Sequence, residues 1–190
     1  MIALLATVLA TTLAVAAPTD EDAPAPVNPA GLLSQLTGQL TGQISQAKQT
    51  VGEKTTQMLG QAMGLLGVPY KRGGTSENTG FDCSGFVRHV YEQSFGKLLP
   101  RRAIEQAKAT ETIDPNELKP GDLVFFNTMK RTFSHVGIYI GDGKFIHSPR
   151  TGKSVQVDDM RSAYWQKRFN GARRVDAPAA STAPPTESNR

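Results

Sequence analysis

The chain has 190 residues, a formal net charge of +4 and 38% hydrophobic residues. This length suits one domain with appendages and excludes two full domains. Its lysines and arginines are scattered, without the basic and aromatic interleaving that is typical of nucleic-acid binding, so we expect no nucleic-acid partner. A basic surface suits an acidic polymer or an anionic membrane, although the same charge also serves solubility alone.

The N-terminal segment, residues 1–16, is predicted to be a secretory signal peptide. An uncharged apolar run begins at Ile2 and ends near Ala17, and "AVA" at 14–16 offers the small-x-small cleavage pattern. The run is short for a membrane span, and a membrane anchor or a buried helix is the alternative. No cysteine follows it, which excludes lipid attachment there. We therefore expect an exported protein, periplasmic or secreted, that is not lipidated at its N-terminus.

Two segments have the composition of disordered chain, the linker 17–30 and the tail 177–190. Between the linker and the domain, residues 31–54 contain "QLTGQLTGQISQ" and are predicted to form an amphipathic helical segment. Such a helix could contact a membrane surface or another protein, or it could be a marginal linker helix. Its apolar stripe consists of Leu33, Leu36, Leu40, Ile44, Ala47 and Val51.

The predicted catalytic domain covers residues 55–176. It starts with a helical pattern that "GVP" stops at 67–69, followed by the loop "YKRGGTSENTG". A second helix is expected to begin at about Asp82 and to end at Gly96. Helices first and antiparallel strands second predict an α+β domain. The strand-like runs, separated by "PGD" and "GDG" turns or by longer loops, are 122–127, 135–141, 144–148 and 154–159.

Cys83 is the only cysteine of the chain. Asp82 is a good N-cap residue and would place Cys83 in the first turn of its helix, where the helix dipole lowers the pKa of a thiol. A thiolate attacks carbonyl groups, and the backbone N–H of Cys83 could donate to the resulting oxyanion. The helical period also puts Cys83 on the same face as Phe86 and Val87. A small buried hydrophobic residue is therefore the alternative.

Two of the three histidines are predicted to meet on one hairpin. If "GDG" forms the loop, Ile140 pairs with Lys144, and His147 lies opposite Gly137. His135 is then a diagonal neighbour of His147 on the same face. With Gly137 between two imidazoles, this face is expected to make a poor hydrophobic layer. The opposite face, with Val136, Ile138 and Ile140, is expected to meet the core.

One cysteine and two convergent histidines match the logic of a cysteine peptidase. One imidazole takes the thiol proton, and another group holds that imidazole in the correct tautomer. A metal site is the competing use of these side chains, but it lacks a fourth ligand at suitable spacing. The third histidine, His89, is predicted to lie at the surface or edge of the second helix.

Several motifs together resemble the NlpC-type family of bacterial cell-wall cysteine peptidases. They are "GVPY" followed by "GG", "DCSGFV", "LPR", "PGDLVFF", "SHVGIYIGDGKFIHS" and "YWQKRFNGARR". The resemblance implies a papain-like fold in which the cysteine-bearing helix packs on an antiparallel β-sheet, with no metal or other cofactor. It also implies site roles: Cys83 as nucleophile, His135 as base and His147 as the group that orients the base. Tyr70, Asp82 and Ser84 would be substrate or oxyanion contacts, although packing at a loop edge is the plain alternative for Tyr70.

The resemblance further implies the substrate, the stem peptides of peptidoglycan. We expect a monomeric endopeptidase that hydrolyses the D-alanyl–meso-diaminopimelate cross-link. Cleavage between γ-D-glutamate and diaminopimelate within one stem is the runner-up. A catalytically silent module that binds cell wall and a secreted toxin with the same chemistry are further alternatives. Arg72 departs from the family pattern, since an aromatic residue often stands there, and it predicts a more basic cleft wall.

Overall fold

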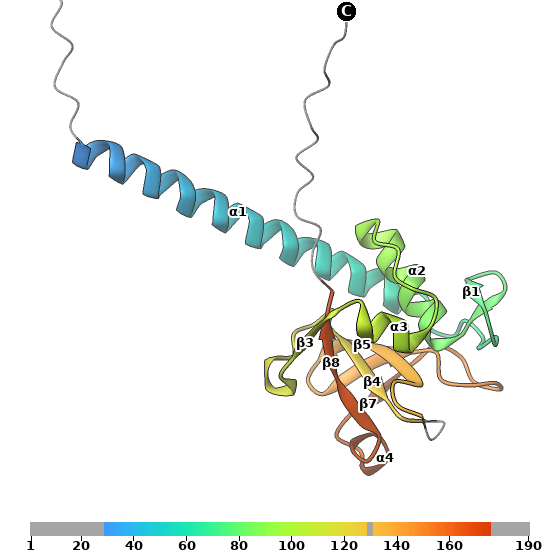
Figure 1. The fold of residues 1–190 in the computed structure, drawn as a ribbon. Helices are drawn as coiled ribbons and strands as arrows, with labels where there is room; N and C mark the ends of the chain where they lie inside the picture. Colours follow the sequence, from blue (N-terminus) through green and yellow to red (C-terminus); the bar gives the residue numbers. More distant parts are fainter. Residues whose placement is uncertain (1–28, 129–130, 176–190) are drawn as a thin grey trace, which may run out of the picture. The chain divides into compact units, whose positions relative to one another are not determined.

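The computed structural model of the protein describes residues 29–128 and 131–175 (Figure 1). The predicted signal peptide 1–16, most of the linker 17–30 and the tail 177–190 lie outside the described residues. Within these two ranges, no helix combines the length and the apolar character that a bilayer span requires.

The first helix, α1 (Pro29–Gly64), runs without a break through the predicted segment 31–54 and continues into the predicted catalytic domain. The chain divides into two compact units, residues 1–42 and 43–190, and α1 crosses that boundary. Leu40 is 60% exposed and Ile44 is 52% exposed, so the apolar stripe of α1 faces solvent at both positions. In the second unit, Met58 and Ala62 are the buried residues of α1 in the core, and the partly buried Leu59 packs against it.

The second helix, α2 (Cys83–Phe95), has the predicted ends. The side chain of Asp82 caps it by accepting a hydrogen bond from the Gly85 N–H at 2.8 Å. Gly96 ends it in a left-handed conformation with φ of 63°, which glycine adopts without steric cost. The helix buries one apolar face, formed by Phe86, Val87, Val90 and Tyr91.

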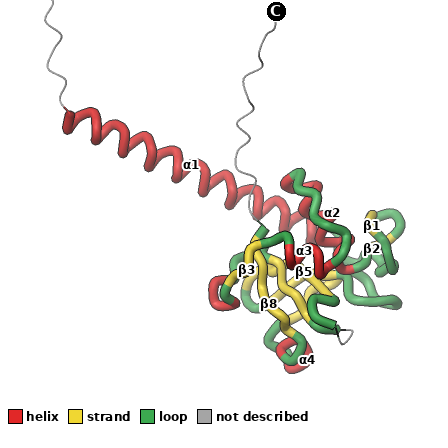
Figure 2. Tube along the Cα trace, in the orientation of Figure 1, coloured by secondary structure: helices red, strands yellow, loops and turns green. Residues whose placement is uncertain are grey.

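A six-stranded antiparallel sheet follows, with the order β3-β8-β4-β5-β6-β7. Figure 2 shows the strands in yellow. All four predicted strands are present, as β4 (Leu123–Phe126), β5 (His135–Gly141), β6 (Lys144–His147) and β7 (Gln156–Asp159). The remaining elements were not predicted from the sequence. They are β1 (Thr75–Ser76), β2 (Gly80–Phe81), α3 (Ala103–Lys108), β3 (Glu111–Ile113), the 3-10 helix η1 (Pro115–Glu117), α4 (Ala163–Gln166) and β8 (Phe169–Arg174).

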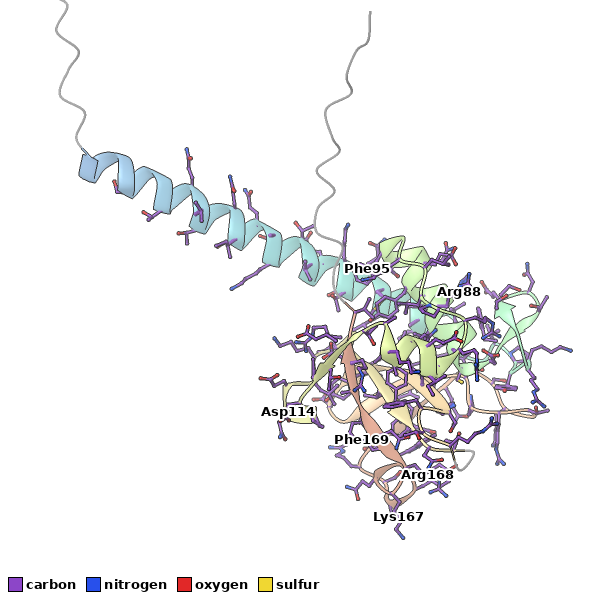
Figure 3. All side chains as sticks on the ribbon, viewed as in Figure 1. Arg88, Phe95, Asp114, Lys167, Arg168 and Phe169 are labelled. Carbon is purple, nitrogen blue, oxygen red and sulfur yellow. The ribbon has the colours of Figure 1, made fainter. Side chains whose placement is uncertain are left out.

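The sheet carries a different apolar layer on each face. One face packs against α2 through Phe125, Val136 and Ile138. The other face holds a second cluster, built from Val124, Phe126, Phe145 and Trp165. Trp165 comes from the short helix α4. Lys167 and Arg168 connect this helix to Phe169, the first residue of β8 (Figure 3).

The second cluster overturns one expectation about the histidine face. His135 stacks on Trp165 with ring centroids 5.8 Å apart, and His147 lies 4.6 Å from the ring of Phe145. The prediction of a poor hydrophobic layer was wrong, because Trp165 from outside the hairpin contacts both imidazoles and Phe145 of the hairpin itself packs on His147. This aromatic surrounding removes the histidines from water.

Gly85 in the "DCSGF" motif allows the close approach of α2 to the preceding loop. A Cβ at Gly85 would lie 2.1 Å from the carbonyl oxygen of Gly74. We expect Gly85→Ala to lower the free energy of unfolding by about 1–3 kcal/mol, measured by chemical denaturation, because overpacking displaces backbone. Gly60→Ala is the matched control: nothing lies within 4 Å of its Cβ position in α1, and alanine should stabilise the helix by about 0.5–1 kcal/mol. Equal stability of Gly85→Ala and wild type would contradict this packing.

Candidate active site

Cys83 is the first residue of α2 and is partly exposed. It packs against the main core cluster while it also lines the cleft described below. Cys83 therefore has both expected properties: its side chain borders the core, as the helical period predicts, and it remains open to a ligand in the cleft. The backbone N–H groups of Val136, Ser84 and Cys83 itself are placed to stabilise a negative charge on the sulfur.

Asp82 binds two backbone N–H groups and one arginine side chain next to Cys83. Its carboxylate accepts hydrogen bonds from the N–H of Gly85 at 2.8 Å and from the N–H of Gly73 at 3.0 Å. Arg101 pairs with both carboxylate oxygens, at 2.6 and 2.9 Å, and also donates to the Ser84 hydroxyl at 3.1 Å. The bidentate pair joins the start of α2 to the segment before α3, and the Gly73 N–H joins it to the loop that carries Tyr70.

The structure confirms the predicted register of the hairpin. Ile138 pairs with Ile146 and Tyr139 with Phe145, which sets Gly137 opposite His147. The register shifts only beside the turn, where Lys144 pairs with Gly141 instead of Ile140. A Cβ on Gly137 would lie 2.9 Å from the carbonyl oxygen of Ile146, so glycine is needed for this approach of the two strands.

The two predicted histidines make direct contact. His135 Nε2 lies 2.6 Å from His147 Nδ1, and both side chains are buried. On the far side, His147 Nε2 lies 3.0 Å from Asp158 Oδ2. The three side chains thus form one hydrogen-bonded chain that leaves only Nδ1 of His135 available for another partner.

Asp158 was missed by the sequence analysis. It lies on β7, where strand pairing places it opposite Phe145 and places Gln156 opposite His147. Its carboxylate also accepts hydrogen bonds from Trp165 Nε1 at 3.2 Å and Gln156 Nε2 at 3.1 Å. The signal was the "QVDD" alternation in a predicted strand after His147, but it becomes readable only once the pairing of that strand is known.

Burial keeps both histidines neutral. Desolvation lowers the pKa of His135 well below the ordinary value of 6.5, and the neighbouring His147 lowers it further, while Asp158 opposes both. Desolvation also lowers the pKa of His147, and the hydrogen bond to Asp158 opposes it. That hydrogen bond in turn lowers the pKa of Asp158. This carboxyl group is therefore ionised and acts as a hydrogen-bond acceptor.

One combination of tautomers satisfies both hydrogen bonds in the series His135, His147 and Asp158. Ionised Asp158 requires the proton of His147 on Nε2, which leaves Nδ1 of His147 as an acceptor. The 2.6 Å contact then requires the proton of His135 on Nε2, so Nδ1 of His135 is the acceptor. The hydrogen-bonded chain therefore presents a neutral imidazole with a free basic nitrogen.

The expectation of a lowered thiol pKa was wrong. Removal of the sulfur from water raises the pKa of Cys83 to about 11, and the charge of Asp82 raises it in the same direction. The backbone N–H groups at the helix start lower it, but by less than these two effects combined. In the ligand-free protein the thiol is protonated at neutral pH, and a base must remove its proton.

Cys83 lies where two cavities join into one cleft. Tyr70, Cys83 and Ser134 line both cavities. One cavity extends along Asp82, Ser84 and the start of α3, and the other contains His135, Asp158 and Trp165. The cleft therefore brings together Cys83, His135 and Tyr70. His147 is buried beneath the cleft surface and contacts His135.

The remaining candidates have simpler surroundings. Burial and the nearby Cys83 raise the pKa of Tyr70, so its hydroxyl is a neutral donor. His89 lies against the ring of Phe81, with centroids 5.0 Å apart, and lines a separate surface cavity. Across the two described ranges, no three His, Cys, Asp or Glu side chains are grouped as metal ligands.

A cysteine at the start of a helix, packed on an antiparallel sheet that supplies a hydrogen-bonded histidine, is the arrangement of papain-like cysteine peptidases. The chain belongs to the NlpC/P60 family, whose model matches residues 67–174. This match covers the segment from the end of α1 to the end of β8 and includes every site residue named above.

Known proteins agree with this assignment. The chain is 43% identical over 142 residues to the murein DD-endopeptidase MepH of Escherichia coli, a match that covers 73% of this chain and 52% of MepH. It is 44% identical over 117 residues to the gamma-DL-glutamyl hydrolase of Bacillus subtilis, covering 61% of this chain and 28% of that protein. An NlpC/P60 family crystal structure from Bacillus cereus matches with a TM-score of 0.59 and 37% identity, over 63% of this chain and 39% of that one. The chain thus spans about half or less of the length of these relatives.

Proposed function

We propose that this protein is a peptidoglycan endopeptidase that uses Cys83 as its nucleophile. The observation that carries the proposal is the hydrogen-bonded series from Asp158 through His147 to His135, because His135 lines the same cavity as Cys83. The similarity to MepH and to the gamma-DL-glutamyl hydrolase supports cell-wall peptides as substrates.

In the proposed mechanism, Nδ1 of His135 removes the proton of the Cys83 thiol as the sulfur attacks the scissile carbonyl carbon. A bond forms between Sγ and that carbon, and the carbonyl oxygen becomes an oxyanion. The new positive charge on His135 is stabilised through Nε2, which donates to His147, and His147 donates to ionised Asp158. Direct protonation of a buried imidazole would otherwise cost several kcal/mol.

The second half of the reaction returns the proton. His135 protonates the leaving amine as the carbon–nitrogen bond breaks, and a thioester remains on Cys83. Water, deprotonated by the same imidazole, then hydrolyses the thioester and restores the thiol. We assign the backbone N–H of Cys83 and the neutral hydroxyl of Tyr70 as donors to the oxyanion.

We assign Asp82 and Ser84 to the support of this site. Asp82 is occupied by Arg101 and by two backbone N–H groups, and the Ser84 hydroxyl is turned to the same pair. Their removal would loosen the loop of Tyr70 and the first turn of α2. With this assignment, the substrate contacts the walls of the cleft and not the side chains of Asp82 and Ser84.

For the bond that is cut, we propose the D-alanyl–meso-diaminopimelate cross-link, because MepH is a murein DD-endopeptidase. Cleavage next to γ-D-glutamate is the second candidate, supported by the gamma-DL-glutamyl hydrolase. We also propose that the protein acts as a monomer after export to the periplasm or outside the cell. The exposed stripe of α1, including Leu40 and Ile44, is the proposed contact for a membrane surface or another protein.

Digestion of purified sacculi and of defined muropeptides tests the function and the bond together. We expect the wild-type protein to convert cross-linked dimers into monomers with intact stems, identified by mass spectrometry. Dimers that persist with shortened stems would replace the cross-link assignment by the γ-D-glutamyl one. Protein that binds sacculi under reducing conditions but releases nothing would point to a silent binding module.

A further inference from the structure

Four arginines border the part of the cleft that runs from Cys83 towards α3. They come from three separate segments: the loop after Tyr70, the approach to α3 and the loop before β5. Asp82 is the one carboxylate among the described residues that line this cavity. The set, termed the basic arm, consists of Arg72, Arg101, Arg102 and Arg131.

The charge of Asp82 is already matched inside the protein. Both of its oxygens lie within 2.9 Å of Arg101 nitrogens, and the side chain of Asp82 is only 15% exposed. Arg101 and Asp82 therefore neutralise each other. Neither contributes a net charge to a ligand in this cavity.

The other arginines keep their charge available. Arg102 has an exposed partner, Glu105, at 3.6 Å, and an exposed pair of this kind contributes little. Arg72 and Arg131 are exposed and form no ion pair with any carboxylate in the described part of the chain. The basic arm thus presents an uncompensated positive charge of at least two beside the nucleophile.

The position of this charge relates it to the scissile bond. Cys83 and Tyr70 line the same cavity as Arg72 and Arg131. A peptide whose carbonyl carbon lies at Cys83 must run into this cavity on one side of that bond. Guanidinium groups bind carboxylates with two parallel hydrogen bonds, and this geometry distinguishes a carboxylate from an amide.

We propose that the basic arm is a subsite for a free carboxylate of the substrate, located within one or two residues of the scissile bond, with Arg72 and Arg131 as its specificity-determining residues. The inference rests on the proposed function and adds the substrate class to it: anionic stem peptides, in preference to stems whose carboxylates are amidated. Two carboxylates of a stem have this chemistry, the one on D-glutamate and the free one on diaminopimelate.

The test compares three cross-linked stem-peptide dimers: one with all carboxylates free, one amidated at D-glutamate and one amidated at diaminopimelate. We expect amidation of the bound carboxylate to raise KM about tenfold with little change in kcat. We expect Arg72→Gln and Arg131→Gln to raise KM by a similar factor on the free dimer and to leave KM for that amidated dimer unchanged. The amidated dimer that loses affinity identifies which carboxylate is bound.

Arg161→Gln is the matched control, because it removes the same charge from a residue that pairs with Asp159 and lines neither cavity of the cleft. It should leave KM within about twofold on all three dimers. Equal KM values for free and amidated dimers, or unchanged KM in both arginine variants, would overturn the subsite while cleavage itself continues. If wild type cleaves no dimer, the binding of the same three peptides to Cys83→Ala protein by calorimetry still decides the subsite, and the proposed function fails separately.

Discussion

Replacement of Cys83 by alanine is expected to abolish hydrolysis and to leave the fold intact. Without the sulfur no thioester forms, and loss of a nucleophile from a coupled set of catalytic groups lowers kcat by at least about 10⁴-fold. The change removes one heavy atom at a partly exposed position of α2, so the free energy of unfolding should change by less than about 1 kcal/mol. Muropeptide release measured by chromatography, together with thermal unfolding, checks both parts.

A thiol titration tests the protonation state that this mechanism assumes. Cys83 is the only cysteine, so alkylation by iodoacetamide reports on this side chain alone. Because burial raises its pKa to about 11, alkylation at neutral pH should be slow and should accelerate with rising pH up to that range. Fast alkylation near neutral pH that disappears in His135→Ala would instead indicate a preformed thiolate–imidazolium pair, and the initial proton transfer would need revision.

Much of the site could be predicted because its determinants are local in sequence. The N-cap at Asp82 and the stop at Gly96 depend on residues next to them, and both are as predicted. The register of the hairpin follows from alternation and a short turn, and the shift beside Gly141 does not reach the histidines. Short-range rules therefore sufficed to bring His135 and His147 together.

The parts that could not be predicted depend on contacts between distant segments. β8 inserts between β3 and β4, and Trp165 just before it covers the histidine face. Asp158 reaches His147 only because β7 pairs with β6 after an irregular loop. The raised pKa of Cys83 likewise reflects burial by tertiary packing, whereas the dipole of α2 alone would lower this pKa. Local pattern could not supply these long-range pairings.

Asp158→Asn is expected to slow the reaction without unfolding the protein. The proposed mechanism makes His135 cationic in the transition state, and ionised Asp158 stabilises this charge through His147. Replacing the carboxylate by a neutral amide removes a charge-assisted hydrogen bond of about 1.5–3 kcal/mol, which corresponds to a roughly 10- to 100-fold decrease in kcat. Asp158 is a positioning residue, since it acts on the reacting atoms only through the two histidines.

The pH profile separates this role from a structural one. His135 must be neutral to accept the thiol proton, and its pKa lies well below 6.5, so the acid limb of kcat/KM should lie below 6.5 in wild type. Asp158 raises the pKa of both histidines. Its neutralisation should lower both values, so neutral His135 persists to lower pH and the acid limb moves in that direction. At its pH optimum the variant is thus slower than wild type, but its rate stays at its maximum down to a lower pH than in wild type.

The adjacent carboxylate supplies the control for that experiment. Asp159 follows Asp158 on β7 but pairs with Arg161 at 2.6 Å, in an exposed ion pair away from the histidines. Asp159→Asn makes the same chemical change one residue further on, so kcat and the acid limb should both stay close to wild type. A decrease in kcat for Asp158→Asn with an unmoved acid limb would mean that the carboxylate only maintains the packing around Trp165. A moved limb in Asp158→Asn alone indicates that its charge reaches His135 through His147, because the two variants have the same net charge and only Asp158 is hydrogen-bonded to His147.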